Sequence, residues 1–217
     1  DNITKIEHFC EHSIQFCSQS LIDLSNFHYF AYTINNELYA MGYNRYYQTG
    51  IESDLEYNIS KPILIQYNFK SQLEFIKCGL YHTLFLNKDG NVYGCGSNHF
   101  GQLSLNNKDK YPITHLSLFS NIIDIYCSNH TSYVINMDNH ILSFGSNKFG
   151  CLGIGSNDIK TTNIVSNNIN IISFNTGHNH IGFINRKGIL YMFGDNTNKQ
   201  CGNIVTQSWF NADITKP

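Results

Sequence analysis

A unit of about fifty residues occurs four times in this 217-residue chain, and no other feature constrains its fold as strongly. Four segments, "YAMGYNRYYQTG", "YGCGSNHFGQLS", "LSFGSNKFGCLG" and "YMFGDNTNKQCG", align without gaps. Their anchor glycines are separated by 54, 49 and 49 residues and are Gly42, Gly96, Gly145 and Gly194. Repetition at this period is typical of solenoids and propellers, in which each unit buries its apolar surface against its neighbours.

Each unit contains a hairpin in constant register. Two short runs rich in aromatic and β-branched residues, such as "LFLN" and "VYGCG", flank a turn whose central residue is Asn36, Gly90, Asn139 or Gly188. Asn and Gly tolerate the positive φ of tight turns, and the flanking runs have the composition of strands. Upstream runs such as "EFIKCG" and "PILIQY" supply a third and a fourth strand. Four short strands per unit, without a helical pattern, predict an all-β chain of β-propeller blades of four antiparallel strands.

We expect one domain over residues 1–217. Its predicted blades are 5–50, 60–104, 112–153 and 162–202, with the start of a further blade at 203–217. Four blades form an open arc with two uncovered apolar faces, which proteins normally avoid. We therefore expect a fragment of a longer propeller, or a ring completed by a further chain or by oligomerisation.

Composition excludes several classes of function. The formal net charge is −2 and the basic residues are scattered, which disfavours nucleic acid as a direct partner. No apolar run approaches the roughly 20 residues that span a bilayer, and the first residues lack a signal-peptide pattern. We expect an intracellular protein, cytoplasmic or nuclear, without membrane contact. The seven cysteines contain no Cys-x-x-Cys pair, which favours reduced thiols over a disulfide framework or a zinc site.

The recurring histidines raise the question of a metal site. His28, His82 and His180 occupy one position of the repeat, but equivalent residues lie a full blade apart, too far for bonds of about 2 Å to one ion. The third unit has Thr131 at this position. The sequence also lacks a Gly-x-Ser-x-Gly elbow and paired carboxylates. We therefore expect no metal, no cofactor and no enzymatic activity.

The motif residues resemble those of a known family. Residues 79–83, "GLYHT", and 96–104, "GSNHFGQLS", are similar to the repeat of the regulator of chromosome condensation family. That repeat has a Gly-x-x-His-Thr element followed by Gly-[Asp/Ser]-Asn-x-[Phe/Tyr]-Gly-Gln-Leu-Gly. Residues 145–153 differ mainly at Cys151, where the other units have Gln. The resemblance covers roughly residues 5–205 and implies a propeller, usually of seven blades, in which the glycines serve shape.

The resemblance implies two functions. Many members are non-catalytic scaffolds that dock a partner protein on a propeller rim, and this is the leading hypothesis. The alternative is a guanine nucleotide exchange factor for a small Ran-like GTPase, after the founding member. That member uses a protruding hairpin wedge, for which the observed intervals leave no room. The photoreceptor branch depends on clustered tryptophans, and Trp209 is the single tryptophan here.

The residues that flank the motif asparagine vary among the four units, within an otherwise constant frame. They are Tyr43 and Arg45, Ser97 and His99, Ser146 and Lys148, and Asp195 and Thr197. Loops on a rigid scaffold are free to vary and commonly carry recognition. We predict partner binding by Tyr43, Arg45, His99 and Lys148. The next aromatic residues are expected to pack between blades, and they are Tyr46, Phe100 and Phe149.

Overall fold

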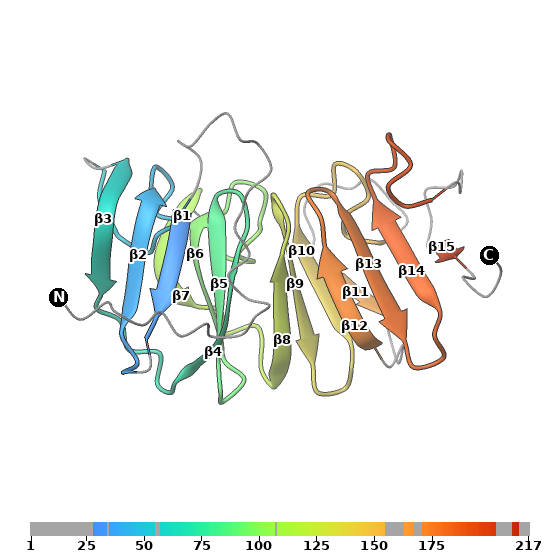
Figure 1. Ribbon diagram of the computed structural model, residues 1–217, viewed down its shortest axis with the longest axis horizontal. Helices are drawn as coiled ribbons and strands as arrows, with labels where there is room; N and C mark the ends of the chain where they lie inside the picture. Colours follow the sequence, from blue (N-terminus) through green and yellow to red (C-terminus); the bar gives the residue numbers. More distant parts are fainter. Residues whose placement is uncertain are drawn as a thin grey trace.

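The computed structural model describes residues 28–33, 35–54, 57–106, 108–154, 163–166, 171–202 and 210–212. Throughout these residues the regular structure is antiparallel β-sheet. Four sheets follow one another along the chain and lie side by side in a row, from the blue sheet at one end to the orange sheet at the other (Figure 1). Each sheet is a propeller blade. The described residues contain no helix that is long and apolar enough to cross a membrane.

The strands of each blade are hydrogen-bonded in chain order. Blade 1 contains β1 (His28–Tyr32), β2 (Leu38–Tyr43) and β3 (Asn58–Ile65). Blade 2 contains β4 (Leu73–Cys78), β5 (His82–Asn87), β6 (Val92–Ser97) and β7 (Lys110–His115). Blade 3 contains β8 (Ile122–Cys127), β9 (Thr131–Asn136), β10 (Ile141–Gly145) and β11 (Asn163–Ser166). Blade 4 contains β12 (Ile171–Thr176), β13 (His180–Asn185), β14 (Leu190–Gly194) and β15 (Phe210–Ala212).

The hairpin turns that the sequence predicted are confirmed. Asn36 and Asn139 have φ of 64° and 59°, and Gly90 and Gly188 have φ of 76° and 74°. Each turn lies between two paired strands, as between β5 and β6, where Leu86 pairs with Val92. Positive φ therefore explains why only Asn and Gly occupy this position.

The limits of the blades differ from those predicted. The segment "PILIQY" was expected to open the second blade, but β3 pairs with β2 and is the last strand of blade 1. Likewise β15, expected in a further blade, pairs with β14 and belongs to blade 4. A repeat reveals the length of the unit but not the strand at which each blade begins, because the same alignment fits either grouping of strands. The strands predicted between residues 5 and 27 lie outside the described residues.

The core consists of three clusters, each between two consecutive blades. Phe30 and Phe69 of blade 1 pack with Phe85 and Tyr93 of blade 2. A second cluster joins blades 2 and 3, and a third joins blades 3 and 4. A fully buried side chain of this size contributes about 1.5–3 kcal/mol. Each blade is therefore stabilised by the apolar side chains that it buries against its neighbours.

The motif glycines allow a close approach between neighbouring strands. Gly96 has φ of 103° and pairs with His82, and a Cβ at Gly96 would lie 2.4 Å from the Tyr81 carbonyl oxygen. Gly145 and Gly194 meet the equivalent carbonyls at 2.4 and 2.2 Å. These glycines therefore serve the geometry of the sheet, as the sequence predicted.

The motif asparagine holds the following loop together. Asn98 Oδ1 accepts a hydrogen bond from the Leu103 amide at 2.9 Å, and its Nδ2 donates to the Leu105 carbonyl at 2.7 Å. Asn44 and Asn147 accept from the equivalent amides five residues on. The amide side chain thus satisfies backbone groups that the turn leaves unpaired.

A chain of polar groups crosses the junction of blades 1 and 2. The His28 Nε2 lies 2.7 Å from the Thr83 Oγ1, which donates to the Gln48 carbonyl at 2.9 Å. Because the hydroxyl donates its hydrogen bond to the main-chain carbonyl of Gln48, its oxygen accepts the second hydrogen bond, and His28 Nε2 is the protonated donor. The Nδ1 atom is buried without a hydrogen-bond partner, so it carries no proton and the imidazole is neutral. We call this arrangement the junction relay, and it recurs between blades 2 and 3 through His82, Ser132 and Gln102.

The junction of blades 3 and 4 is built differently. The histidine is replaced there by Thr131 and the hydroxyl residue by Ile181, while the main-chain carbonyl of the Gln48 and Gln102 position belongs to Cys151. Thr131 Oγ1 donates to the Ser146 carbonyl of its own blade at 2.8 Å. Cys151 and Ile181 are buried in the apolar cluster between the two blades. The relay is therefore absent from this junction, which other hydrogen bonds cross, such as that from Thr176 Oγ1 to the Cys127 carbonyl at 2.8 Å.

Acid should destabilise the two relay junctions. Burial lowers the pKa of His28 and of His82 from 6.5 to about 3. A depressed folded-state pKa means that the unfolded chain binds the proton first, so stability falls as the pH drops from 6.5 towards 3. We expect a loss of about 3 kcal/mol per relay histidine between pH 6.5 and pH 4, measured by urea unfolding.

Two variants separate this effect from general acid unfolding. His82→Gln should lower the stability at pH 7 but flatten its decline below pH 6.5. His178→Gln, at an exposed histidine, should change neither the stability nor its pH profile. An unchanged acid profile in His82→Gln would contradict a neutral relay histidine.

A pair of glycines tests the role of the motif. Gly96→Ala should cost about 3 kcal/mol or more, because its Cβ would collide with the Tyr81 carbonyl at 2.4 Å. Gly101 also has positive φ, 79°, but a Cβ there meets nothing within 4 Å. Gly101→Ala should therefore cost only about 1 kcal/mol of backbone strain. Equal losses in the two variants, measured by urea unfolding, would refute the steric explanation.

Candidate functional site

The loops of the blades gather at two ends. We call the end that carries the Gly-Ser-Asn motif loops, such as residues 98–109 after β6, the motif end. The short connections before β5, β9 and β13 lie there too, because the first residue of each strand pairs with a motif glycine. We call the opposite end, with the hairpin turns and residues 66–72, the turn end. All four predicted site residues lie at the motif end.

A row of aromatic rings crosses blades 1 to 3 at the motif end. We call it the aromatic row, and it consists of Tyr43, Tyr46, Tyr81, Phe100, His99 and His130. The ring centroids of Tyr46 and Tyr81 are 5.1 Å apart, and those of Tyr81 and His130 are 5.8 Å apart. The Phe100 ring lies 5.0 Å from the His130 ring. Five of the six side chains are partly exposed and His99 is exposed, so the row is accessible to a partner.

The repeat explains how the row forms. The aromatic residue two positions after the motif asparagine packs against the residue directly before the second strand of the next blade. Tyr46 therefore meets Tyr81, and Phe100 meets His130. In blade 4 the corresponding residue is Asn179, which has no ring. Phe149 of blade 3 is accordingly 37% exposed.

The structure places two of the predicted site residues within blade 1. Tyr43 is partly buried, with its ring 6.3 Å from that of Tyr81. Arg45 is exposed, and a hydrogen bond from its guanidinium to Tyr43 raises the pKa of the arginine. Arg45 thus adds a fixed positive charge at the blade 1 end of the row.

The other two predicted residues lie on blades 2 and 3. His99 is exposed, with its ring 5.0 Å from the Phe100 ring and its Nδ1 3.7 Å from an Asp109 oxygen. The Lys148 ammonium lies 5.3 Å from the centroid of the Phe149 ring. The four residues are therefore spread along one end and do not converge on a pocket. Their part in partner binding stays a prediction.

Burial sets the charge of the middle of the row. It lowers the pKa of His130, and the nearby His99 and Lys148 lower it further. The lowered pKa favours the neutral form of His130, which lies in the row between the positive charges of Arg45 and Lys148.

Sequence reasoning missed Tyr81 and His130, although both belong to the row. The signal was available in their position, directly before His82 and Thr131 of the repeat. Both residues lie in the short connections just before β5 and β9, at the motif end, where loop residues reach the surface. Of the flanking residues considered, Ser97 and Ser146 are buried and cannot contact a partner.

The buried thiols and hydroxyls are unsuited to nucleophilic chemistry. Burial raises the pKa of Cys95 well above its usual value and that of Cys151 to about 12. The His82 and Ser132 pair has the residue types of a hydrolase dyad, but both side chains are fully buried and the hydroxyl donates to a carbonyl. Among the described residues, no three His, Cys, Asp or Glu side chains are grouped to hold a metal ion.

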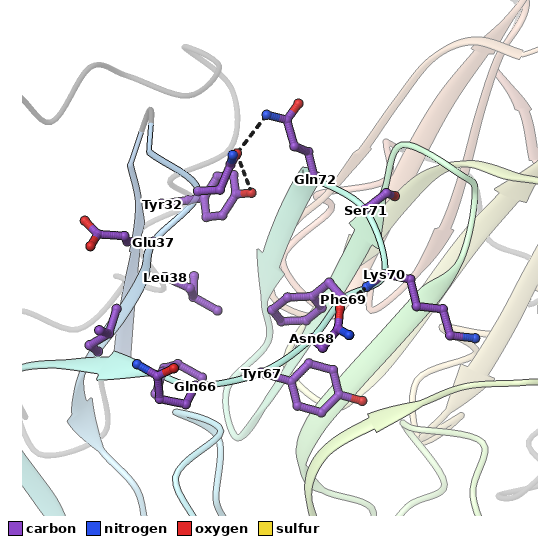
Figure 2. Close-up of a pocket in the computed structure, with 13 residues that line it drawn as sticks. Tyr32, Glu37, Leu38, Gln66, Tyr67, Asn68, Phe69, Lys70, Ser71 and Gln72 are labelled. Carbon is purple, nitrogen blue, oxygen red and sulfur yellow. Dashed lines mark hydrogen bonds between the residues drawn. The ribbon is translucent and has the colours of Figure 1, made fainter.

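A cleft of about 460 Å³ opens at the turn end between blade 1 and residues 66–72 (Figure 2). Leu38, Tyr67 and Phe69 supply its apolar surface. A polar wall forms where Asn36 Oδ1 accepts hydrogen bonds from the Tyr32 hydroxyl at 3.0 Å and from Gln72 Nε2 at 2.8 Å. This cleft could not be predicted from the repeat, because the hairpin that contains Asn36 supplies only one wall and residues 66–72, between β3 and β4, supply the other.

Comparison with known proteins identifies the repeat. Two family models described as "Regulator of chromosome condensation (RCC1) repeat" match residues 74–102 and 89–135. The X-linked retinitis pigmentosa GTPase regulator of Canis lupus familiaris is 36% identical over 87 residues, which are 40% of this chain and 8% of that protein. The guanine nucleotide exchange factor SRM1 of Saccharomyces cerevisiae is 34% identical over 71 residues, 32% of this chain and 15% of that protein.

Solved structures share the fold. Human WBSCR16 has a TM-score of 0.65 at 21% identity, over 78% of this chain and 46% of that one. Prp20p from Saccharomyces cerevisiae has a TM-score of 0.63 at 23% identity, over 78% of this chain and 42% of that one. The chain thus spans less than half of these structures and a small part of the curated relatives. The family models therefore identify regulator of chromosome condensation repeats within residues 74–135, and the sheet topology and the structural neighbours show that the described blades have a β-propeller fold.

Proposed function

We propose that the chain is a non-catalytic scaffold that docks a partner protein on the motif end of its blades. The observation that carries this proposal is the aromatic row, which presents partly exposed rings continuously across three blades. Aromatic residues and arginine are enriched in the energetically important parts of protein interfaces. Arg45 stands fully exposed beside this row and supplies the charged contact.

The construction of the blades supports a binding role. Two junction relays and the apolar clusters fix the blades relative to one another, so the row is held in place before a partner arrives. A preorganised surface loses little conformational entropy on binding. Histidines and thiols carry reactivity in many enzymes, whereas His28, His82 and Cys95 are buried between blades here.

A small GTPase is the partner class that the relatives suggest. One relative is named a GTPase regulator and another a guanine nucleotide exchange factor, and Prp20p is described as binding Gsp1p. The alternative function is therefore nucleotide exchange on a Ran-like GTPase. Both functions place a protein on the propeller, and they differ in whether nucleotide leaves.

The two arginines of the chain provide a matched test of the docking surface. Arg45→Glu reverses an exposed charge at the aromatic row, and Arg186→Glu does the same at an exposed site at the turn end. With a panel of small GTPases as probes, Arg45→Glu should weaken binding at least about tenfold, measured by isothermal titration calorimetry. Arg186→Glu should bind as the unmodified chain does, and equal weakening by both variants would exclude the motif end.

Nucleotide release separates the two functions. The GTPases that bind are loaded with fluorescent GDP and mixed with the chain at substoichiometric concentration. A scaffold should form a stable complex without accelerating release, because it stabilises no nucleotide-free state. Accelerated nucleotide release would contradict the scaffold function and favour the exchange function. If no GTPase binds, small GTPases are excluded as the partner class. A photocrosslinker placed at Arg45 or at Arg186 would then show whether a partner protein is captured at the motif end or at the turn end.

A further inference from the structure

The cleft at the turn end has an apolar floor, and its two charged residues point away from it. Leu38 and Phe69 are buried and form the floor, and Tyr67 is 38% exposed beside them. Figure 2 shows the side chains of Glu37 and Lys70 extending outward on opposite sides of the cleft. The volume of about 460 Å³ is within the range of pockets that hold drug-sized ligands. A charged group that entered this cleft would lose its water without gaining a partner of opposite charge.

One wall of the cleft presents unpaired main-chain groups. Residues 66–68 follow β3 without a turn, and all three are exposed. The main chain of Gln66, Tyr67 and Asn68 makes no hydrogen bond to any other residue that the structure describes. In the connection between blades 2 and 3 the chain turns at once instead, because the Phe119 amide donates to the Leu116 carbonyl at 3.1 Å. Residues 66–68 therefore offer peptide groups of the kind that pair with an added extended chain.

This wall is fixed at both ends. Before it, Ile65 pairs with Leu38 at the end of β3. After it, the Phe69 carbonyl accepts hydrogen bonds from Asn87 Nδ2 at 2.7 Å and from the Tyr93 hydroxyl at 2.9 Å. Asn87 and Tyr93 are both buried in blade 2. Because the wall is held in place before a ligand arrives, little conformational entropy is lost when its peptide groups are used.

The side chains around the cleft offer hydrogen-bond donors whose orientation their neighbours determine. Lys88 Nζ donates to Gln72 Oε1 at 2.6 Å, so Gln72 Nε2 faces Asn36 and donates to its Oδ1 at 2.8 Å. Asn36 Nδ2 is consequently left without an acceptor among the described residues. Asn68 Nδ2 is free in the same way, because Asn68 Oδ1 accepts from the Lys70 amide at 2.9 Å. Free amide donors suit the carbonyl oxygens of a peptide.

We propose that the turn-end cleft binds an extended segment of a partner protein through its main chain. The segment pairs with the main chain of residues 66–68, and one of its carbonyls accepts from Asn36 Nδ2. An uncharged apolar side chain of the segment enters the cleft between Leu38 and Phe69. The cleft lies at the opposite end of the blades from the aromatic row, so this inference does not depend on docking at the motif end.

Blocked pentapeptides test the proposal on the unmodified chain. The chain is labelled with nitrogen-15 and titrated with acetyl-Ala-Ala-X-Ala-Ala-amide, in which X is Leu, Phe, Ala or Asp, and the amide shifts are followed by NMR. The Leu and Phe peptides should shift the amides of residues 66–72. They should bind at least about tenfold more tightly than the Ala and Asp peptides, as expected for burial of one apolar side chain. Methylation of the peptide's main-chain nitrogens should abolish these shifts, because a methylated nitrogen cannot donate to residues 66–68.

Two glycine variants provide a matched comparison. Asn36 and Asn139 are turn residues with positive φ, and glycine occupies the same position in blades 2 and 4, as Gly90 and Gly188. Both variants should therefore keep their hairpins. Asn36→Gly removes the donor at the cleft and should weaken binding of the Leu peptide about fivefold, as expected for one hydrogen bond. Asn139→Gly, on blade 3 and away from the cleft, should leave the affinity unchanged.

Several results would overturn the proposal. They are the absence of shifts in residues 66–72, shifts confined to another part of the chain, and equal binding of the Leu and Asp peptides. An unchanged affinity in Asn36→Gly, or equal weakening by both glycine variants, would contradict it as well. The amide spectrum of each variant verifies its fold, and the peptide series on the unmodified chain requires neither variant.

Discussion

The structure depends on packing between consecutive blades. Each blade is a single sheet with apolar side chains on both faces, and such a sheet is not stable in water by itself. The three clusters join blade to blade, with Phe85 and Tyr93 facing blade 1 while Leu84 and Leu86 face blade 3. The motif glycines and asparagines serve this arrangement, because they let the loops turn tightly without holding neighbouring blades apart.

Polar groups add direction to the apolar contacts. A relay requires the histidine of one blade to meet a hydroxyl of the next, and it therefore fixes the rotation of one blade on another. The aromatic row follows the relays: Tyr81 directly precedes His82, and the pairs Tyr46–Tyr81 and Phe100–His130 span the two polar junctions. At the apolar third junction the row stops at Asn179. The external surface is thus aligned by the same positions that set the internal junction.

Much of the fold could be predicted because the repeat imposes it four times. Asn36 and Gly90 were identified as turn residues from their register alone, and their positive φ confirms the reason. The grouping of strands into blades could not be predicted. The repeated sequence is the same whether β3 is the last strand of blade 1 or the first strand of blade 2, and only its hydrogen bonding to β2 decides. The sequence predicted only some residues of the aromatic row. Variation around the motif pointed to Tyr43 and His99, whereas Tyr81 acquires its role only from the ring that the previous blade places beside it.

The third junction lacks a relay but still carries hydrogen bonds between blades. The Asn129 amide donates to the His178 carbonyl at 3.1 Å, and the Leu80 amide donates to the Asn129 carbonyl at 3.0 Å. The Cys151 thiol donates to the Asn179 carbonyl at 3.1 Å. Main-chain contacts at the motif end therefore connect blades 2, 3 and 4 whether or not a junction contains a relay. Because Leu80 directly precedes Tyr81, these contacts also help to fix the position of the aromatic row.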